Sequence, residues 1–164
     1  MRCVSAIDIN VPLEVVWEIT QNPERRNEWD YRVTESKKLS EGPFDKGTRC
    51  SVSGSFGFKY FLEYKYVLYE KCVKTAIKVT RCKGFPITGG GGGWTYEKVD
   101  EHSCRFHINF FLKLRKMPFE KSVDKYIVEP LFKWMSEKSL KQLKKIAEEE
   151  WALSNANQKD LIRV

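Results

Sequence analysis

The chain of 164 residues carries its clearest structural signal in the stretch FKYFLEYKYVL, residues 58–68. Apolar and aromatic side chains alternate there with Lys59, Glu63 and Lys65. A period of two is typical of a β-strand that buries one face and exposes the other. The face predicted to be buried consists of Phe58, Tyr60, Leu62, Tyr64, Tyr66 and Leu68.

Strands of similar character are predicted before and after this one. In the last of them Phe106, Ile108 and Phe110 share one face, while polar side chains occupy the other. The connections between consecutive strands are short, and EGPFDKG at residues 41–47 is a turn built from Gly, Pro and Asp, which indicates an antiparallel meander. The other predicted strands span residues 3–11, 31–40, 48–54, 73–79, 94–100 and 104–114.

Two short helices are predicted between the first and second strands. Pro12 opens the first of them, PLEVVWEIT at residues 12–20, where a proline has no cost because the backbone N–H would lack a partner anyway. Asn22 and Pro23 end this helix and begin the second one, PERRNEW at residues 23–29.

A long helix is predicted from about residue 120, because the apolar period changes there to that of a helix. It extends to about Trp151, and Pro130 is expected to kink it or to fray its first part. Residues 1–153 form a single predicted domain, and residues 154–164, which lack strong periodicity, are predicted to be a loose tail. The apolar stripe of the helix consists of Val123, Ile127, Leu131, Trp134, Met135, Leu143 and Ile146.

The composition is that of an ordinary globular domain, with 41% hydrophobic residues, 31% charged residues and a net charge of +7. The lysines are spread along the chain, and their densest group is followed at once by three glutamates at 148–150. This arrangement predicts a solvated helix face, so no nucleic-acid partner is expected. The lysines of that group are Lys138, Lys141, Lys144 and Lys145.

The compartment is predicted from the cysteines and from the hydrophobic runs. The five cysteines are odd in number and form no CxxC pair, so neither a disulfide framework nor a zinc site is indicated. The N-terminal stretch lacks the apolar core of a signal peptide, and no apolar run approaches the ~18–20 residues that span a bilayer. A reduced, cytoplasmic protein is therefore expected.

Four segments, in this order and at this spacing, resemble the helix-grip fold of the START and Bet v 1-like superfamily, specifically its polyketide cyclase and lipid-transport branch. The likeness covers about residues 5–150. One departure is the glycine run Gly89–Gly93, which is long for the family. The segments are IDINVPLEVVWEITQNPERRNEW (7–29), GPFDKGTRC (42–50), GGGGWTYEKVDE (90–101) and EPLFKWMSEKSLKQLKKIAEE (129–149).

The resemblance implies an α+β fold in which a seven-stranded curved antiparallel sheet, two short helices and a long C-terminal helix enclose a cavity. Aromatic stripes at strand spacing form a filled core far more often than a pocket, but with the resemblance a cavity is the favoured interpretation. Its lining would be mostly apolar, with tyrosine hydroxyls as the few polar groups. The candidate ligand-binding residues are Tyr60, Leu62, Tyr64, Tyr66, Ile77, Val79, Trp94, Tyr96, Phe106, Ile108, Phe110, Ile127, Leu131, Trp134 and Met135.

Three functions remain open on this basis. The first is binding or transfer of a hydrophobic small molecule, such as a lipid, a quinone, a sterol-like ring or a polyketide. The second is a polyketide cyclase or dehydratase, for which only the pocket tyrosines or an inward-facing Arg81 could supply an acid or base. The third is a co-chaperone-like protein-interaction module with a filled cavity. The absence of a catalytic triad or a placed carboxylate pair favours the first function. The oligomeric state is not predicted.

Several smaller features receive plain interpretations. The glycine run lacks the ending of a phosphate loop and is predicted to be a mobile loop beside the cavity mouth, so no nucleotide or other cofactor is expected. Glu28 and Asp30 flank Trp29 and are predicted to be caps or surface charges, and His102 and His107 to be surface histidines rather than metal ligands. Transient contact with an anionic membrane is an open alternative to simple solvation for Lys113, Arg115, Lys116, Lys121 and Lys125.

Overall fold

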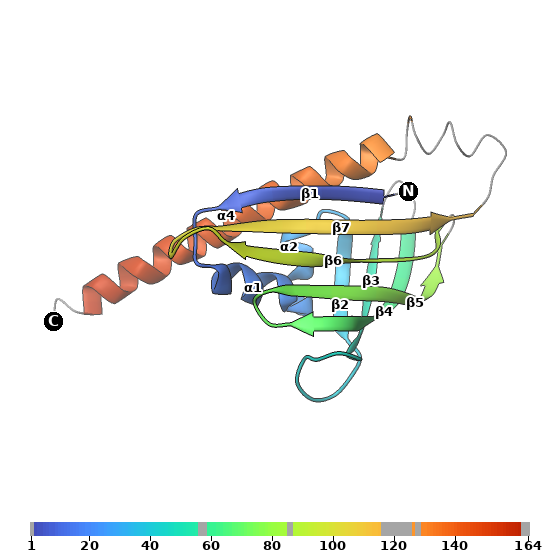
Figure 1. The fold of residues 1–164 in the computed structure, drawn as a ribbon, viewed down its shortest axis with the longest axis horizontal. Coiled ribbons are helices and arrows are strands. Elements are labelled where there is room, and N and C mark those ends of the chain that lie inside the picture. The colour runs from blue at the N-terminus through green and yellow to red at the C-terminus, as the bar shows by residue number, and fades with distance from the viewer. Residues whose placement is uncertain (1, 56–58, 85–86, 116–125, 127–128, 162–164) are drawn as a thin grey trace.

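In the computed structural model of the protein, which describes residues 2–55, 59–84, 87–115, 126 and 129–161, seven strands form one antiparallel sheet (Figure 1). The order across the sheet is β1-β7-β6-β5-β4-β3-β2, so consecutive strands from β2 to β7 are neighbours. The predicted meander and the α+β fold class are therefore confirmed. The strands are β1 (Arg2–Ile9), β2 (Val33–Lys38), β3 (Arg49–Ser55), β4 (Lys59–Glu70), β5 (Lys74–Lys83), β6 (Ile87–Lys98) and β7 (Cys104–Leu114).

The first strand lies at the edge of the sheet, beside the last one. β1 pairs with β7 in a continuous register from Arg2 opposite Phe111 to Ile9 opposite Cys104. Within β4 the predicted alternation holds as far as Tyr66, since Tyr64 and Tyr66 are buried while Lys65 is exposed. A register shift between Tyr66 and Leu68 then breaks it, so that Tyr69 rather than Leu68 packs against the core. Phe58, which the prediction placed on the same buried face, lies outside the described residues.

Short helices connect β1 to β2, as predicted. They are α1 (Leu13–Gln21), the 3-10 turn η1 (Pro23–Arg25) and α2 (Arg26–Trp29). Pro12 stands directly before α1, and the side-chain oxygen of Asn22 accepts a hydrogen bond of 3.0 Å from the backbone N–H of Glu24. These helices lie against the long helix α4 (Glu129–Leu161).

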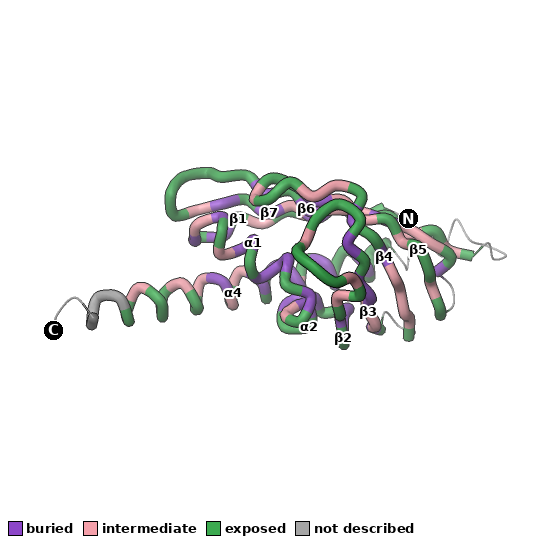
Figure 2. The backbone as a smooth tube through the Cα atoms, turned by 90° about the horizontal axis from the view of Figure 1, so that it is seen from below, coloured by how far each residue is buried: buried purple, intermediate pink, exposed green. Residues whose placement is uncertain are grey.

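Helix α4 differs from its prediction at its C-terminal end. Pro130 is the second residue of the described helix and residues 127–128 lie outside the described residues, so the expected kink stays a prediction. Residues 154–161 continue the helix in place of the expected loose tail, because a helix already nucleated extends readily through a segment without Gly or Pro. The C-terminal part of α4 projects beyond the sheet and is mostly exposed (Figure 2). Val123 and Ile127 of the predicted stripe lie outside the described residues.

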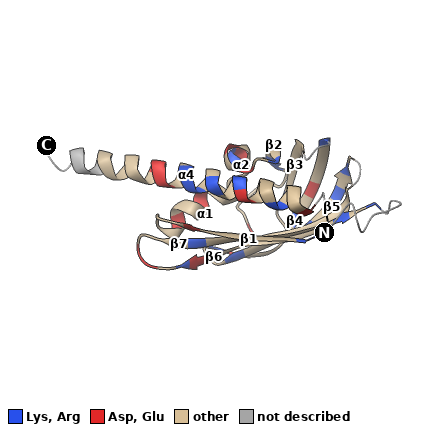
Figure 3. Cartoon of the chain, turned by 90° about the horizontal axis from the view of Figure 1, so that it is seen from above, with Lys and Arg blue, Asp and Glu red and all other residues tan. Residues whose placement is uncertain are grey.

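The exposed side of α4 carries charges of both signs, as predicted (Figure 3). Lys144 pairs with Glu148 at 3.6 Å and Lys145 with Glu149 at 3.9 Å. Both are i,i+4 pairs with Lys preceding Glu, and each exposed pair of this kind contributes only about 0.3–0.5 kcal/mol. The helix is held instead by its apolar face.

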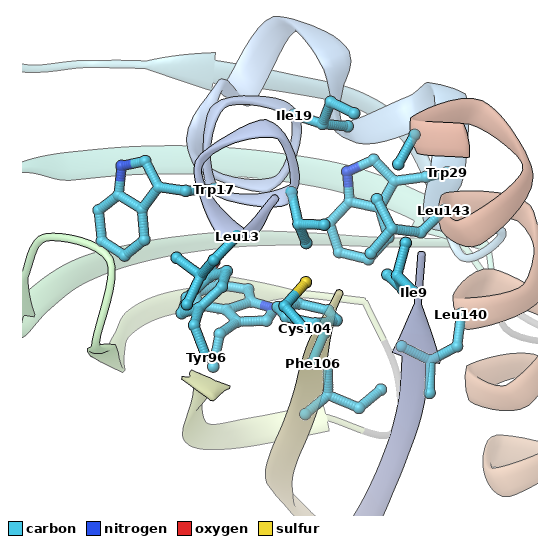
Figure 4. Close-up of a cluster of buried hydrophobic side chains, with 14 of the residues drawn as sticks. Ile9, Leu13, Trp17, Ile19, Trp29, Tyr96, Cys104, Phe106, Leu140 and Leu143 are labelled. Carbon is cyan, nitrogen blue, oxygen red and sulfur yellow. The ribbon is translucent and has the colours of Figure 1, made fainter. Parts of the chain in front are cut away.

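The main core lies where α1, α4 and the sheet meet (Figure 4). Leu140 and Leu143 of α4 meet Ile9 of β1, Trp29 of α2 and Phe106 of β7, and each of these side chains is at most 2% exposed. Trp29 and Phe106 meet edge to face, with ring centroids 6.3 Å apart. Burying a large apolar side chain contributes about 1.5–3 kcal/mol, so this cluster supplies much of what holds the helices to the sheet.

The glycine run belongs to β6, so the prediction of a mobile loop is wrong. Gly91, Gly92 and Gly93 pair with both β5 and β7. The ring of Phe110 lies over Gly92, where an added Cβ would stand 2.3 Å from Phe110 Cδ1 and 2.4 Å from the backbone oxygen of Asn109. The absent side chain therefore lets β7 approach closely and gives Phe110 its place on the inner face.

Candidate functional site

A cavity of about 80 Å³ lies on the inner face of the sheet, beside the main core, with which it shares Tyr64, Ile77 and Phe110. Helix α4 covers β1, α1 and α2 but has few contacts with the central strands, so the inner face of β4, β5 and β6 is only partly filled. The space is small beside the ~300–1,000 Å³ of typical small-molecule pockets. The lining is Arg26, Asp30, Arg32, Val33, Val52, Tyr60, Leu62, Tyr64, Ile77, Val79, Ile87, Gly91, Phe110, Leu112 and Phe132.

The structure brings part of the predicted lining together around this cavity. The predicted residues that border it come from the middle strands and from the end of β7 near Gly91. All of them follow from the alternation that placed them on the inner face. They are Tyr60, Leu62, Tyr64, Ile77, Val79 and Phe110.

A second group of predicted lining residues belongs to the packed core instead. These side chains do face inward, but α1 and α4 reach them and fill the space, so they do not border the described cavity. Trp17 of α1, for example, packs against Tyr96 with ring centroids 4.9 Å apart. The group consists of Tyr66, Trp94, Tyr96, Phe106 and Ile108.

The hydroxyl groups of the inner tyrosines are occupied by protein partners. Tyr96 Oη lies 2.6 Å from Thr20 Oγ1 and accepts a hydrogen bond of 2.6 Å from Gln21 Nε2. Tyr66 Oη donates to Gln21 Oε1 at 3.1 Å, and Tyr60 Oη donates to the backbone oxygen of Arg32 at 3.0 Å. The prediction that tyrosines supply the polar anchors of the site is thus not supported by these three residues.

The helix residues predicted to line the cavity lie elsewhere. Leu131 and Trp134 are 38% and 54% exposed, so these two predictions are wrong. Met135 is buried in a small cluster with Cys3 and Phe132, and of these three only Phe132 borders the cavity. The buried face of α4 consists instead of Phe132, Met135, Leu140, Leu143 and Ala147. Ile127 lies outside the described residues.

The polar wall of the cavity is a charged cluster that the sequence interpretation missed. Asp30 is 1% exposed, and it lies between Arg26 and Arg32, which are 8% and 6% exposed. Arg26 Nη2 is 2.9 Å from Asp30 Oδ2, and Arg32 Nε is 2.8 Å from Asp30 Oδ1. The interpretation of Asp30 as a cap or surface charge is therefore wrong: it is a buried ion-pair partner.

Helix α4 closes this cluster from the other side. Arg32 Nη1 donates to Ser136 Oγ at 3.2 Å, and the backbone N–H of Tyr31 donates to Ser139 Oγ at 2.9 Å. Ser136 and Ser139 are both fully buried. Two small hydroxyl residues on α4 therefore let the helix approach the charged turn and satisfy its polar groups.

The electrostatics of the cluster favour the charged forms of Asp30 and Arg26. Burial by itself would raise the pKa of Asp30, but the charges and hydrogen bonds of Arg32 and Arg26 outweigh it and hold that pKa well below its ordinary value of 3.8. Burial would likewise lower the pKa of Arg26, and the attraction of Asp30 raises it instead. Burial raises the pKa of Tyr60 and of Tyr64 far above the ordinary value of 10.0.

A local signal for the cluster is present in the sequence RRNEWDYR, residues 25–32. Arg26 precedes Trp29 by three positions and Asp30 by four, and residues at these spacings share a helix face. Since Trp29 is apolar and ends a helix, its burial draws Arg26 and Asp30 inward with it. The charges of Arg26 and Asp30 suggest exposure, whereas their spacing from Trp29 on the helix indicates burial.

Other candidate groups do not reach the cavity. Arg81, considered as an inward acid or base, has a side chain that is 56% exposed and pairs with Glu63 at 3.1 Å, so this prediction is wrong. The described residues contain no cluster of His, Cys, Asp and Glu able to hold a metal ion. Of the basic residues around the start of the last helix, Lys116, Lys121 and Lys125 lie outside the described residues.

The fold and its cavity define a helix-grip protein of the START and Bet v 1-like superfamily. The chain belongs to the family described as polyketide cyclase/dehydrase and lipid transport, which matches residues 2–148. This family supports hydrophobic-ligand binding or cyclase activity in general terms, without a particular substrate.

Solved structures share the fold at low sequence identity. The Zhui aromatase/cyclase of Streptomyces sp. R1128 superimposes with a TM-score of 0.75 at 11% identity, covering 90% of this chain and 93% of that one. The protein TTHA0849 of Thermus thermophilus gives 0.75 at 16% identity, covering 92% and 99%. A START superfamily protein of Mycobacterium smegmatis gives 0.65 at 12%, covering 91% and 94%.

One curated relative is similar in sequence. It is described as the uncharacterized membrane protein YndG of Bacillus subtilis (strain 168), with 24% identity over 163 residues and 96% of this chain covered. The chain spans 59% of the length of that relative. In the part of the chain that the structure describes, no helix has the length and hydropathy needed to cross a membrane.

Proposed function

We propose that the protein binds a hydrophobic small molecule in the cavity between the central strands and Phe132 of α4, and that it acts as a carrier rather than as an enzyme. The observation that carries this proposal is the chemistry of the lining. Apolar side chains make up most of it, and a ligand buried against them gains about 0.8 kcal/mol for each CH₂ group.

The ionisable groups of the described lining support a carrier. General acid–base catalysis is most efficient when a group has a pKa near the working pH. Here the pKa values move away from neutral pH, since those of Tyr60 and Tyr64 are raised and that of Asp30 is lowered. Asp30 is therefore a carboxylate at neutral pH, held by two guanidinium groups, and the tyrosines are neutral there.

The small volume of the cavity implies that a ligand must displace lining side chains. Phe110 and Phe132 are the largest apolar groups of the lining and come from opposite walls, β7 and α4. Outward movement of either ring would enlarge the space without breaking the sheet. Binding is therefore proposed to be coupled to a local rearrangement at these two residues.

Native mass spectrometry of freshly purified protein, followed by organic extraction, tests this function first. A stoichiometric lipophilic molecule that leaves on extraction would support a carrier and identify its chemical class. A protein that is empty and also takes up no hydrophobic fluorescent probe would overturn the proposal and favour an interaction module.

A pair of variants locates the binding. Val79 borders the cavity, whereas Val67 on β4 is exposed on the outer face. Val79→Trp should fill the cavity and lower probe uptake at least tenfold, whereas Val67→Trp should leave it unchanged. Equal uptake by the two variants would place the probe outside the cavity.

Cyclisation of a poly-β-ketone chain is the second candidate, favoured by the guanidinium groups of Arg26 and Arg32 on the cavity wall. Fixed cations of this kind can stabilise the enolate that forms during ring closure. Incubation with a synthetic poly-β-ketone thioester, followed by mass spectrometry and absorbance spectroscopy, tests it. Protein-dependent formation of an aromatic product that requires Arg32 would establish the enzyme and displace the carrier.

A further inference from the structure

The charges buried beside the cavity do not balance. Arg26 and Arg32 face a single carboxylate, that of Asp30, and all three residues are more than nine-tenths buried. Among the residues that the structure describes, no other Asp, Glu, Lys or Arg is buried. The wall therefore carries a net charge of +1 away from water, an arrangement that is costly unless an anion compensates it.

Asp30 has no capacity left to neutralise both arginines. Its Oδ2 atom accepts hydrogen bonds from Arg26 Nε at 3.1 Å, Arg26 Nη2 at 2.9 Å and Arg32 Nη2 at 3.1 Å. Its Oδ1 atom accepts from Arg32 Nε at 2.8 Å and from the backbone N–H of Arg32 at 3.3 Å. The two arginines thus share the oxygens of one carboxylate.

One guanidinium nitrogen still offers its donors. Arg32 Nη1 donates to Ser136, but Arg26 Nη1 makes no hydrogen bond to any described residue. The Arg26 guanidinium lies over the rings of Trp29 and Trp94, 4.9 Å and 4.6 Å from their centroids. These rings fix its plane and compensate part of its charge, so the unused edge has a defined direction.

The apolar lining lies next to this cation. Arg26 and Arg32 border the same space as Leu62, Ile77 and Val79. Phe110 and Phe132 stack on Arg32, with its guanidinium carbon 5.7 Å and 4.8 Å from the two ring centroids. A molecule that fills the cavity therefore meets hydrocarbon on one side and a cationic donor on the other.

We propose that the ligand of this cavity is a hydrophobic carboxylic acid, whose carboxylate binds Arg26 Nη1 and is held by the net positive charge of Arg26, Asp30 and Arg32. This inference rests on the proposed function, because it assigns the chemical class of the molecule in the same cavity. A planar carboxylate suits the fork of a guanidinium, and the apolar part of the acid replaces the rings that now close the space.

Binding by matched acids and amides tests the inference. Phenylacetate with phenylacetamide, and octanoate with octanamide, have the same shape but differ in charge. Titration calorimetry on the full chain should show each acid binding at least tenfold more tightly than its amide, since a charge-assisted hydrogen bond exceeds a neutral one. Equal binding of acid and amide would overturn the inference while leaving a hydrophobic carrier intact.

Variants assign the preference to the cluster. Arg26→Gln should remove the preference for the acid, and Arg81→Gln, which deletes the same charge from the surface, should retain it. An acid preference that survives Arg26→Gln in a folded protein would place the acid elsewhere and overturn the inference. If neither the acids nor the amides nor a hydrophobic probe bind to the wild-type chain, the proposed function itself fails.

A measurement on the wild-type chain alone keeps the inference testable if Arg26→Gln does not fold. The carboxylate of ¹³C-labelled octanoate can be titrated by NMR in its bound form. A carboxylate beside a net positive cluster should titrate at least one pH unit below free octanoate. A bound acid that titrates at or above the free value would exclude contact with the arginines.

Discussion

Arg32 Nε lies 2.8 Å from Oδ1 of Asp30, and this buried ion pair joins the turn after α2 to the wall of the cavity. Arg26 binds the other oxygen of the same carboxylate at 2.9 Å. Removing the charge of Asp30 would leave two buried guanidinium groups without their anion. Asp30→Asn should therefore lower the free energy of unfolding by about 3–5 kcal/mol, measured by urea denaturation at neutral pH.

The matched control for this variant is Asp8→Asn on the surface. Asp8 also pairs with an arginine, Arg105, at 2.6 Å, but the two side chains are 59% and 48% exposed. Solvent screens an exposed pair, so Asp8→Asn should be nearly neutral. Similar losses in the two variants would show that the burial of Asp30 has no energetic consequence.

The acid sensitivity of the fold should also depend on Asp30. Its folded-state pKa lies below the unfolded value, so it contributes stability that is present above about pH 4 and is lost as the pH falls below that. The free energy of unfolding of the wild type should accordingly fall between pH 5 and 2, and the difference from Asp30→Asn should narrow. Other carboxylates titrate in both proteins and cancel in that difference. If the difference in free energy of unfolding between the wild type and Asp30→Asn stayed constant with pH, that result would contradict the lowered pKa of Asp30.

Most of the sheet could be predicted because a strand that buries one face has apolar side chains at every second position. The glycine half of β6 has no such pattern and was not predicted. Which side chains of the buried face are packed and which border a cavity could not be predicted. Trp94 and Ile77 both point inward, and only the path of α1 and α4 decides that Trp94 is packed and that Ile77 borders a cavity. This path is set by contacts distant in sequence, such as Leu143 against Ile9, which periodicity does not record.

The charged cluster could not be predicted from the charges in the sequence, because charged side chains are usually exposed. Arg26, Asp30 and Arg32 are buried because they satisfy one another and two serines of α4, a condition that becomes visible only when the turn and the helix are placed together. The glycine run was misinterpreted for a related reason. A run of glycines by itself indicates a loop, whereas Gly92 lies in a strand at a place where the ring of Phe110 leaves no room for a side chain.

Tyr96 should be a structural residue rather than a ligand contact. Its hydroxyl group contacts Thr20 and Gln21 of α1, at 2.6 Å in both cases. Tyr96→Phe leaves the buried amide of Gln21 without this partner and should cost about 1–3 kcal/mol, with hydrophobic-probe binding unchanged. Tyr31→Phe, at a position that is 55% exposed, is the control and should be neutral in denaturation. A loss of probe binding without a loss of stability would indicate that Tyr96 contacts the ligand.

The close approach of β6 and β7 gives the last prediction. A methyl group at position 92 would stand 2.4 Å from the backbone oxygen of Asn109 and would displace the ring of Phe110. Gly92→Ala should therefore lower the free energy of unfolding by about 1–3 kcal/mol, as overpacking does, and should also alter probe uptake because Phe110 borders the cavity.

Gly89 lies in the same strand, but its nearest neighbour, the Lys113 side chain, is 3.9 Å away. Gly89→Ala should be neutral or stabilising by about 0.5–1 kcal/mol, since alanine restricts the unfolded chain more than glycine does. Denaturation of both variants side by side measures the difference, and equal stabilities would mean that the ring of Phe110 does not depend on the space above Gly92.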